Sequence, residues 1–162
     1  MKPQKVGTNL LNFPGSSQII PEPLGVCLVI GAWNYPIQLS FAPAIAALAA
    51  GNTLVLKPSE LAANSAACMA SLVAKYFDPQ IFTVVLGGVA ETTQLLAQRF
   101  DKIFFTGSPA VGKIVYQAAA QHLTPVTLEL GGKSAKALDR VFAVAQRLNG
   151  IGSDQVEAAK NA

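Results

Sequence analysis

The feature that most constrains the fold is a regular alternation of short apolar segments with longer amphipathic ones along residues 25–130. The apolar segments are rich in β-branched residues and are bounded by turn-forming residues, which is typical of strands buried on both faces. We expect strands at 25–31, 53–57, 81–86, 102–105 and 126–130, and helices at 38–50, 62–76, 91–99 and 110–122. This order predicts βαβ units with right-handed crossovers, and therefore a doubly wound, Rossmann-like parallel α/β sheet of about five strands with helices on both faces.

The regions on either side of this alternation have a different character. Residues 1–24 are rich in proline, glycine, asparagine and serine, and they predict an extended N-terminal arm with little core of its own. Residues 135–162 predict a helical tail, because apolar side chains recur there at helical spacing, at Leu138, Val141, Phe142, Ala145 and Leu148. The chain is thus expected to divide into an arm, a sheet domain at 25–134 and a tail.

Composition argues against several classes of protein. The chain is 51% hydrophobic and 13% charged, so it is not disordered as a whole. Its net charge of +3 comes from scattered lysines and arginines without a basic stripe, which argues against nucleic-acid binding. The uncharged stretch between Glu22 and Lys57 is long enough to span a bilayer, but glycine, proline, asparagine and glutamine interrupt it. We therefore expect no membrane span.

The two cysteines, Cys27 and Cys68, lie far apart in apolar segments and match neither a disulfide framework nor a zinc-ligand spacing. We expect both to be small, buried hydrophobic side chains, and we expect no metal site. No secretory leader pattern opens the sequence, and unpaired thiols suit a reducing compartment. The expected location is therefore the cytoplasm.

Polar side chains follow the first two expected strands, at the edge where parallel sheets bind ligands. Asn34 follows the first strand, and its amide either donates to a developing oxyanion or holds the loop together beside Trp33. Lys57 and Glu60 come at the end of the second strand and can bind a ribose, the ammonium at one hydroxyl and the carboxylate as acceptor from another. In the alternative reading, Ser59 and Glu60 form the N-cap and first turn of the next helix, which leaves Lys57 unexplained.

Two further sets of residues follow the later strands. Gly107 and Gly112 bracket the start of the helix after the fourth strand, a spacing that suits close approach of backbone N–H groups to a pyrophosphate. It is neither the G-x-G-x-x-G pattern nor a P-loop. Glu129 lies at the end of the fifth strand beside two glycines, and either acts as a general base or pairs with Lys133. The only histidine, His122, is near a helix end and is expected to be structural.

The order of these motifs resembles the aldehyde dehydrogenase superfamily. The segments AWNYP, KPSE, FTGSPAVG and LELGGKS each follow an expected strand in this order. The sequences of the segments EPLGVCLVIGAWNYP and HLTPVTLELGGKS are most similar to those of the class 3 or fatty-aldehyde branch. The resemblance covers residues 10–134 and implies an NAD(P)-binding domain at 25–134, from a family whose full-length members oxidise an aldehyde to a carboxylate.

The resemblance implies a role for each matched position. Asn34 would stabilise the oxyanion, and Glu129 would be the general base. The cofactor would contact Trp33 in its pocket, Lys57 and Glu60 at the adenosine ribose, Gly107, Ser108 and Gly112 at the pyrophosphate with Phe105 and Val111 packing nearby, and Leu130 and Gly131 at the nicotinamide. Glu60 should repel a 2′-phosphate, so the expected cofactor is NAD, with NADP also tolerated in the class 3 branch.

The chain departs from the family in one respect that bears on activity. The family's nucleophilic cysteine is expected a few tens of residues beyond Glu129, and no cysteine follows Cys68. Residues 135–162 do not match the family's motifs. The resemblance therefore implies a cofactor-binding fragment that acts on an aldehyde only if the missing half is supplied. The alternative is a non-catalytic partner that pairs with full-length aldehyde dehydrogenase subunits or with itself.

Overall fold

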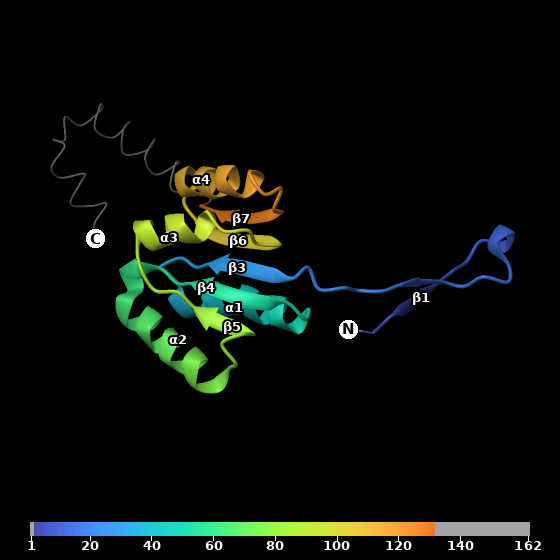
Figure 1. The fold of residues 1–162 in the computed structure, drawn as a ribbon, viewed down its shortest axis with the longest axis horizontal. Coiled ribbons are helices and arrows are strands. Elements are labelled where there is room, and N and C mark those ends of the chain that lie inside the picture. Colours follow the sequence, from blue (N-terminus) through green and yellow to red (C-terminus); the bar gives the residue numbers. More distant parts are fainter. Residues whose placement is uncertain (1, 132–162) are drawn as a thin grey trace, which may run out of the picture. The chain divides into compact units, whose positions relative to one another are not determined.

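The computed structural model describes residues 2–131 and contains a five-stranded sheet, shown in Figure 1. The strand order is β5-β4-β3-β6-β7, with β3 at Val26–Ile30, β4 at Thr53–Lys57, β5 at Phe82–Val84, β6 at Lys102–Gly107 and β7 at Val126–Leu130. β3 pairs in parallel with β4 and with β6, and β4 pairs in parallel with β5. The predicted parallel, doubly wound α/β fold is confirmed. The helical tail expected at 135–162 lies outside the described residues.

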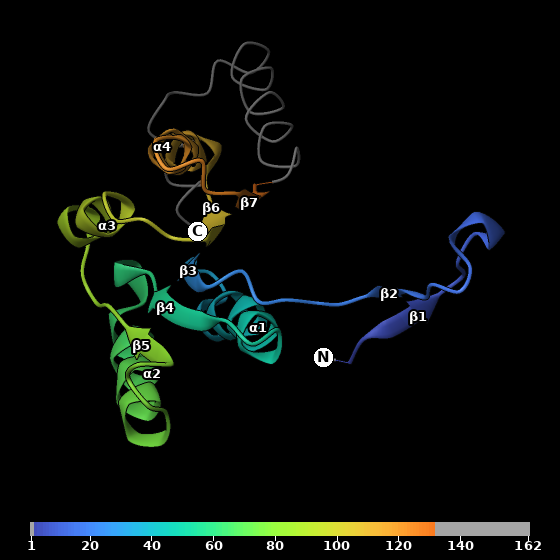
Figure 2. The same ribbon diagram turned by 45° about the vertical axis from the view of Figure 1, so that its right-hand side comes forward.

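Four helices cover the two faces of the sheet. They are α1 (Pro36–Ala49), α2 (Ala63–Tyr76), α3 (Val89–Leu96) and α4 (Pro109–Ala120). Core contacts place α1 and α2 on one face and α3 and α4 on the other, and Figure 2 shows α1 and α4 on opposite sides of the sheet. Each helix lies where the sequence predicts one, with its ends shifted by at most three residues.

The central strand β3 contributes to both hydrophobic cores. Cys27 and Val29 point to the face covered by α1 and α2, whereas Leu28 and Ile30 point to the face covered by α3 and α4. Full burial of a side chain such as Leu28 contributes roughly 1.5–3 kcal/mol relative to leaving it exposed. Because both faces of β3 are covered, its sequence is apolar throughout instead of alternating with polar residues.

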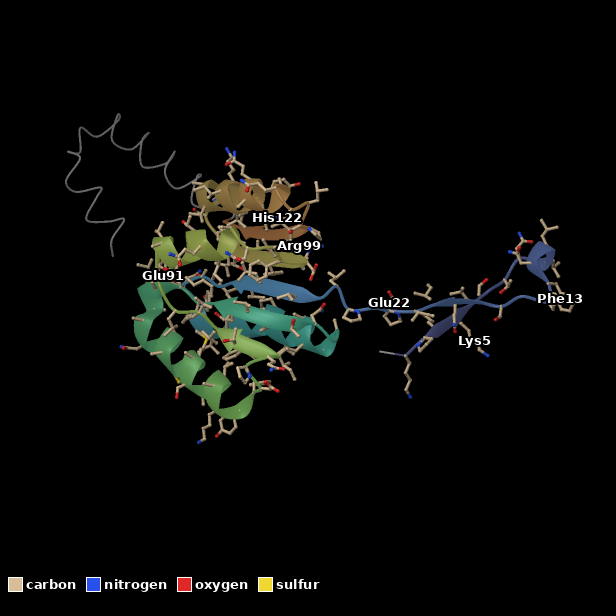
Figure 3. The ribbon with its side chains drawn as sticks, in the orientation of Figure 1. Lys5, Phe13, Glu22, Glu91, Arg99 and His122 are labelled. Carbon is tan, nitrogen blue, oxygen red and sulfur yellow. The ribbon has the colours of Figure 1, made fainter. Side chains whose placement is uncertain are left out.

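The N-terminal arm contains a small sheet that the sequence analysis does not predict. β1 (Gln4–Val6) pairs antiparallel with β2 (Ser17–Ile19), and the short 3-10 helix η1 (Leu10–Asn12) lies in the connection. Figure 3 labels Lys5 and Phe13 on this segment. No residue from 2 to 20 is buried. The two strands have three residues each and no apolar periodicity, so their sequence carries little strand signal.

The amino end of β3 is held by the side chain of Asn52. Its Oδ1 atom accepts hydrogen bonds from the backbone N–H groups of Leu24 at 2.7 Å and Gly25 at 3.1 Å. Its Nδ2 atom donates to the carbonyl of Ala47, in α1, at 2.9 Å. Asn52 is 7% exposed, and its hydrogen bonds to Leu24 and Gly25 are partly buried. The side chain therefore fixes the end of α1 to the start of β3.

We expect Asn52→Ala to lower the free energy of unfolding by about 1–3 kcal/mol, because two partly buried backbone N–H groups lose their acceptor. Urea unfolding followed by circular dichroism measures the change. The matched control is Asn64→Ala, at an exposed position of α2, which should alter stability by less than about 0.5 kcal/mol. Equal effects of the two substitutions would show that Asn52 does not anchor β3.

The two cysteines differ in exposure. Cys27 is buried in β3, and desolvation by burial, followed by the nearby Asp101, raises the pKa of its thiol against an opposing effect of Lys102. Cys68 is exposed on α2. The prediction that both thiols are buried is therefore wrong for Cys68. The reason is its position on the solvent face of α2, since the adjacent Met69 fills the core.

A thiol-reactive disulfide reagent should label one cysteine rapidly in the native protein. We expect Cys68 to react roughly a hundredfold or more faster than Cys27, because reaction of Cys27 requires local opening of the sheet. The absorbance of the released reagent thiol counts the fast-reacting groups, and Cys68→Ser should abolish the fast phase. Two fast-reacting thiols in the native protein would contradict the burial of Cys27.

Candidate functional site

The carboxyl ends of the strands share one edge of the sheet. In Figure 1 the arrowheads of β3, β4 and β5 point to the same side. The neighbouring strands β3 and β6 are followed by α1 and α4, which cover opposite faces, so the winding of the chain reverses between them. Doubly wound sheets bind their ligands at such a switch point. It is flanked by the loop 31–35 after β3 and by the junction of β6 and α4, at Gly107 and Ser108.

The loop after β3 presents Trp33 and Asn34 at the surface, and Trp33 is 60% exposed. Gly31 begins this loop, and its N–H donates to the carbonyl of Lys57 at 3.0 Å. A Cβ atom on Gly31 would collide with the hydroxyl of Ser40 in α1, so glycine lets the helix pack against the end of the strand. The Asn34 amide is accessible at the sheet edge. This position is compatible with both predicted roles, donation to an oxyanion and stabilisation of the loop.

Lys57 and Glu60, after β4, are in direct contact. The Lys57 side chain is 2% exposed, and its Nζ atom donates to the carbonyl of Pro58 at 2.6 Å and to Oε2 of Glu60 at 3.2 Å. A buried ammonium requires such partners, because its desolvation alone costs several kcal/mol. The hydroxyl of Ser59 accepts a hydrogen bond from the N–H of Leu61 at 3.3 Å. Ser59 is thus a helix cap, and Lys57 is accounted for by its contact with Glu60.

The Glu60 carboxylate remains partly in solvent, with its side chain 48% exposed. A hydrogen bond from its own backbone N–H lowers the pKa of Glu60, the Lys57 ammonium lowers it further, and partial desolvation opposes both. The carboxylate is therefore ionised at neutral pH. It offers hydrogen-bond acceptors at the carboxyl-end edge of the sheet.

The N-terminus of α4 carries no acidic side chain. Ser108 is the N-cap, and its hydroxyl accepts a hydrogen bond from the N–H of Val111 at 3.3 Å, with Pro109 in the first turn. Gly112 is buried, and its N–H donates to the carbonyl of Ser108 at 2.9 Å. Because the first turn contains no acid, the positive end of the helix dipole is not neutralised there. Such a terminus suits an anionic ligand.

Phe105 and Val111 occupy different environments. Phe105 is a buried core residue between the sheet and helices α3 and α4. Its ring lies 2.5 Å from the position that a Cβ atom on Gly107 would take, so a side chain at Gly107 would force the ring to move. Val111 is exposed on the first turn of α4. Of the two residues predicted to pack near the pyrophosphate, Phe105 is therefore in the core and Val111 is at the surface.

β7 carries the remaining predicted residues. Leu128 packs against the core on the side of α4, so the side chain of Glu129, the next residue along the strand, points to the opposite face, where it is exposed. Leu130 and Gly131 are also exposed. The alternative partner predicted for Glu129, Lys133, lies outside the described residues. Glu129 is thus accessible near the end of β7, and its proposed role as a base stays a prediction.

The structure brings only some of the predicted residues into contact. Among residues 2–131 the only ion pair is that between Lys57 and Glu60. Asn34 and Glu129 take no part in it; they lie on the loop after β3 and on β7. The predicted site is therefore assembled from separate strand ends that share one sheet edge.

One charged residue at this edge was missed by the sequence analysis. Glu91 lies in the first turn of α3, and its Oε2 atom accepts a hydrogen bond from the N–H of Gly88 at 2.7 Å. Figure 3 shows Glu91 on the side toward which the strands run, with Arg99 and His122 toward the other end. An acid three residues after a glycine, in the first turn of an amphipathic helix, is a helix-start signal that could have identified it.

We expect Ser108→Ala to destabilise the protein by about 1 kcal/mol, because the N–H of Val111 loses its cap. The control is Ser71→Ala, at an exposed position within α2. It should be neutral or slightly stabilising, since alanine is the better helix former. Chemical unfolding of both variants provides the comparison, and a neutral Ser108→Ala would show that the hydroxyl does not cap α4.

No helix within residues 2–131 combines the length and apolar character needed to cross a bilayer. No group of three or more His, Cys, Asp or Glu side chains gathers there in an arrangement that could hold a metal ion.

Comparison with known sequences gives one consistent family. The sequence profile of the aldehyde dehydrogenase family matches residues 7–153 and so extends past Ser134, where the motif resemblance ends. Aldehyde dehydrogenase family 3 member H1 of Arabidopsis thaliana is 55% identical over 139 residues, which are 86% of this chain and 29% of that protein. Family 3 member A2 of Rattus norvegicus is 57% identical over 132 residues, which are 82% of this chain and 27% of that protein. The chain spans less than a third of the length of these relatives.

Solved structures share the fold. The substrate-bound state of Staphylococcus aureus AldH is 51% identical, with a TM-score of 0.79, over 81% of this chain and 29% of that one. Mycobacterium tuberculosis aldehyde dehydrogenase complexed with NAD+ is 36% identical, with a TM-score of 0.70, over 80% of this chain and 26% of that one. These similarities cover most of the present chain and about a quarter to a third of each enzyme.

Proposed function

Because the chain belongs to the aldehyde dehydrogenase family, we propose that it binds a nicotinamide dinucleotide at the carboxyl-end edge of its sheet, with NAD preferred over NADP. The observation that carries the proposal is the buried Lys57, whose ammonium holds the ionised Glu60 at that edge. The class of cofactor is supported by the similar enzyme of Mycobacterium tuberculosis, which was solved in complex with NAD+.

The residues fit the polar parts of such a cofactor. The Glu60 carboxylate accepts hydrogen bonds from ribose hydroxyls, while Lys57 fixes its position. The same carboxylate repels a 2′-phosphate, which is the basis of the preference for NAD. At the start of α4, backbone N–H groups and the helix dipole attract the pyrophosphate. Gly107 and Ser108 lie at that helix start, and Gly107 lets the Phe105 ring pack beside it, because a Cβ atom there would collide with the ring.

The chemistry that we assign to the whole family enzyme is oxidation of an aldehyde to a carboxylate, for which the bound dinucleotide supplies the hydride acceptor. Asn34 donates a hydrogen bond to the developing oxyanion, and Glu129 takes a proton from a thiol or a water. The covalent step requires a thiolate beside the substrate. Cys27 is buried within β3 and Cys68 lies on α2, so neither is placed for attack. We therefore propose that these 162 residues bind cofactor without oxidising aldehydes by themselves.

A second candidate function is that of a non-catalytic partner of full-length aldehyde dehydrogenase subunits. It is favoured by three apolar side chains of the N-terminal arm that are each more than 80% exposed, Leu10, Leu11 and Phe13. Exposed apolar clusters often mark interaction surfaces. Co-purification of the tagged chain with a full-length homologue, combined with failure to bind nucleotide, would favour this candidate over the first.

Titration with NADH tests the proposed cofactor site, through nucleotide fluorescence and the emission of Trp33, the only tryptophan. We expect saturable binding. Glu60→Ala should weaken it by about 1–2 kcal/mol, or roughly 5- to 30-fold in Kd, because the ribose loses a charged acceptor. Glu22→Ala, in the arm, is the matched control and should bind like the unsubstituted chain.

Asn34→Ala should leave the affinity for NADH nearly unaltered, because its proposed role lies with the substrate oxyanion. Circular dichroism verifies that each variant is folded. A folded chain that does not bind NADH rejects the proposal, and full affinity in Glu60→Ala removes that residue from the site. A large loss in Asn34→Ala would show that Asn34 belongs to the cofactor site instead.

A further inference from the structure

The turn between β5 and α3 is closed by the side chain of Glu91. Its Oε2 atom accepts a hydrogen bond from the N–H of Gly88 at 2.7 Å, and the hydroxyl of Thr92 donates to the carbonyl of Gly88 at 2.7 Å. Gly87 has a φ of +139°, and a Cβ atom there would collide with Glu91. The carboxylate is therefore folded back over a turn that requires glycine.

This turn lies beside Glu60, the partner of Lys57. A Cβ atom on Gly88 would lie 4.0 Å from Cγ of Glu60, an ordinary van der Waals distance. The pKa of Glu91 is lowered by its own backbone N–H, by the N–H of Gly88 and, to a smaller extent, by the ammonium of Lys57, against a desolvation effect. Glu60, which is held by Lys57, and Glu91 thus flank one turn.

The N-termini of α3 and α4, both at this edge, differ in charge. The first turn of α3 contains Glu91, whose carboxylate already binds a backbone N–H, whereas the first turn of α4 contains no acid. An anionic group is therefore favoured at α4 and disfavoured at α3. Because Glu60 adjoins the α3 turn, a ligand group that binds Glu60 lies near two carboxylates and one ammonium.

We infer that Glu91 is a second specificity-determining residue of the ribose site, an inference that rests on the proposed binding of a nicotinamide dinucleotide. Glu91 holds the Gly87–Gly88 turn against Glu60, and its charge adds to that of Glu60. The site consequently accepts free ribose hydroxyls and disfavours a 2′-phosphate, which carries about −1.5 to −2 charges at neutral pH. Glu60 and Glu91 share the discrimination, although they lie on different connections of the sheet.

Calorimetric titration of the whole chain with ADP-ribose and with 2′-phospho-ADP-ribose tests this role at low ionic strength. Glu91→Gln removes the charge but retains an amide oxygen that accepts the N–H of Gly88, so the turn is kept. We expect the ratio of the two Kd values, phosphorylated over unphosphorylated, to fall roughly three- to tenfold in this variant. The difference from the unsubstituted chain should shrink in 1 M salt, where the Debye length is about 3 Å.

Glu22→Gln, in the arm, is the matched control and should leave the ratio unchanged. Glu91→Ser, which also removes the charge and leaves a shorter polar side chain, replaces Glu91→Gln if the latter does not fold and should shift the ratio in the same direction. An unchanged ratio, or equal weakening of both ligands, overturns the inference and leaves the proposed cofactor site standing. If the folded, unsubstituted chain binds neither ligand, both the inference and the proposed function are overturned.

Discussion

The rest of the structure depends on the burial of β3 between two neighbouring strands and two layers of helices. Its hydrogen bonds run to β4 on one side and to β6 on the other. Its side chains alternate between the two cores, so neither face can turn to solvent without loss of apolar contacts. The loop that carries Trp33 and Asn34 begins where this strand ends. The position of that loop relative to the start of α4 is therefore determined by the pairing of β3 with β6.

Lys57 links this sheet to the electrostatics of the candidate site. Its backbone pairs with Ile30, and its carbonyl accepts the N–H of Gly31, so its Cα position is determined by the sheet. Its side chain is buried, and the ammonium has Pro58 and Glu60 as partners. A charge held in this way cannot reorient freely as a surface lysine does. It therefore fixes the position of the Glu60 carboxylate at this edge.

Much of the fold could be predicted because the strands of the sheet are continuously apolar and the helices between them begin and end at turn-forming residues. β4 agrees with its predicted range at both ends, because Asn52 and Pro58 bound it. β1 and β2 could not be predicted, since three polar or mixed residues carry no measurable period. The exposure of Cys68 was also missed, because an apolar neighbourhood in sequence does not reveal which face of α2 a residue occupies.

The sequence by itself determined the order in which the strands and helices of the five-stranded sheet domain follow one another along the chain. It also determined the apolar positions that fill the core and the identity of the polar residues at the strand ends. Such features depend on residues within a few positions of one another, through side-chain periodicity and turn chemistry. Only the tertiary structure decided which strands are neighbours in the sheet and that Lys57 is buried. It also decided that Glu60 lies beside the glycine turn that Glu91 closes. These contacts join segments far apart in the chain, and they arise from strand pairing and burial, which local sequence does not encode.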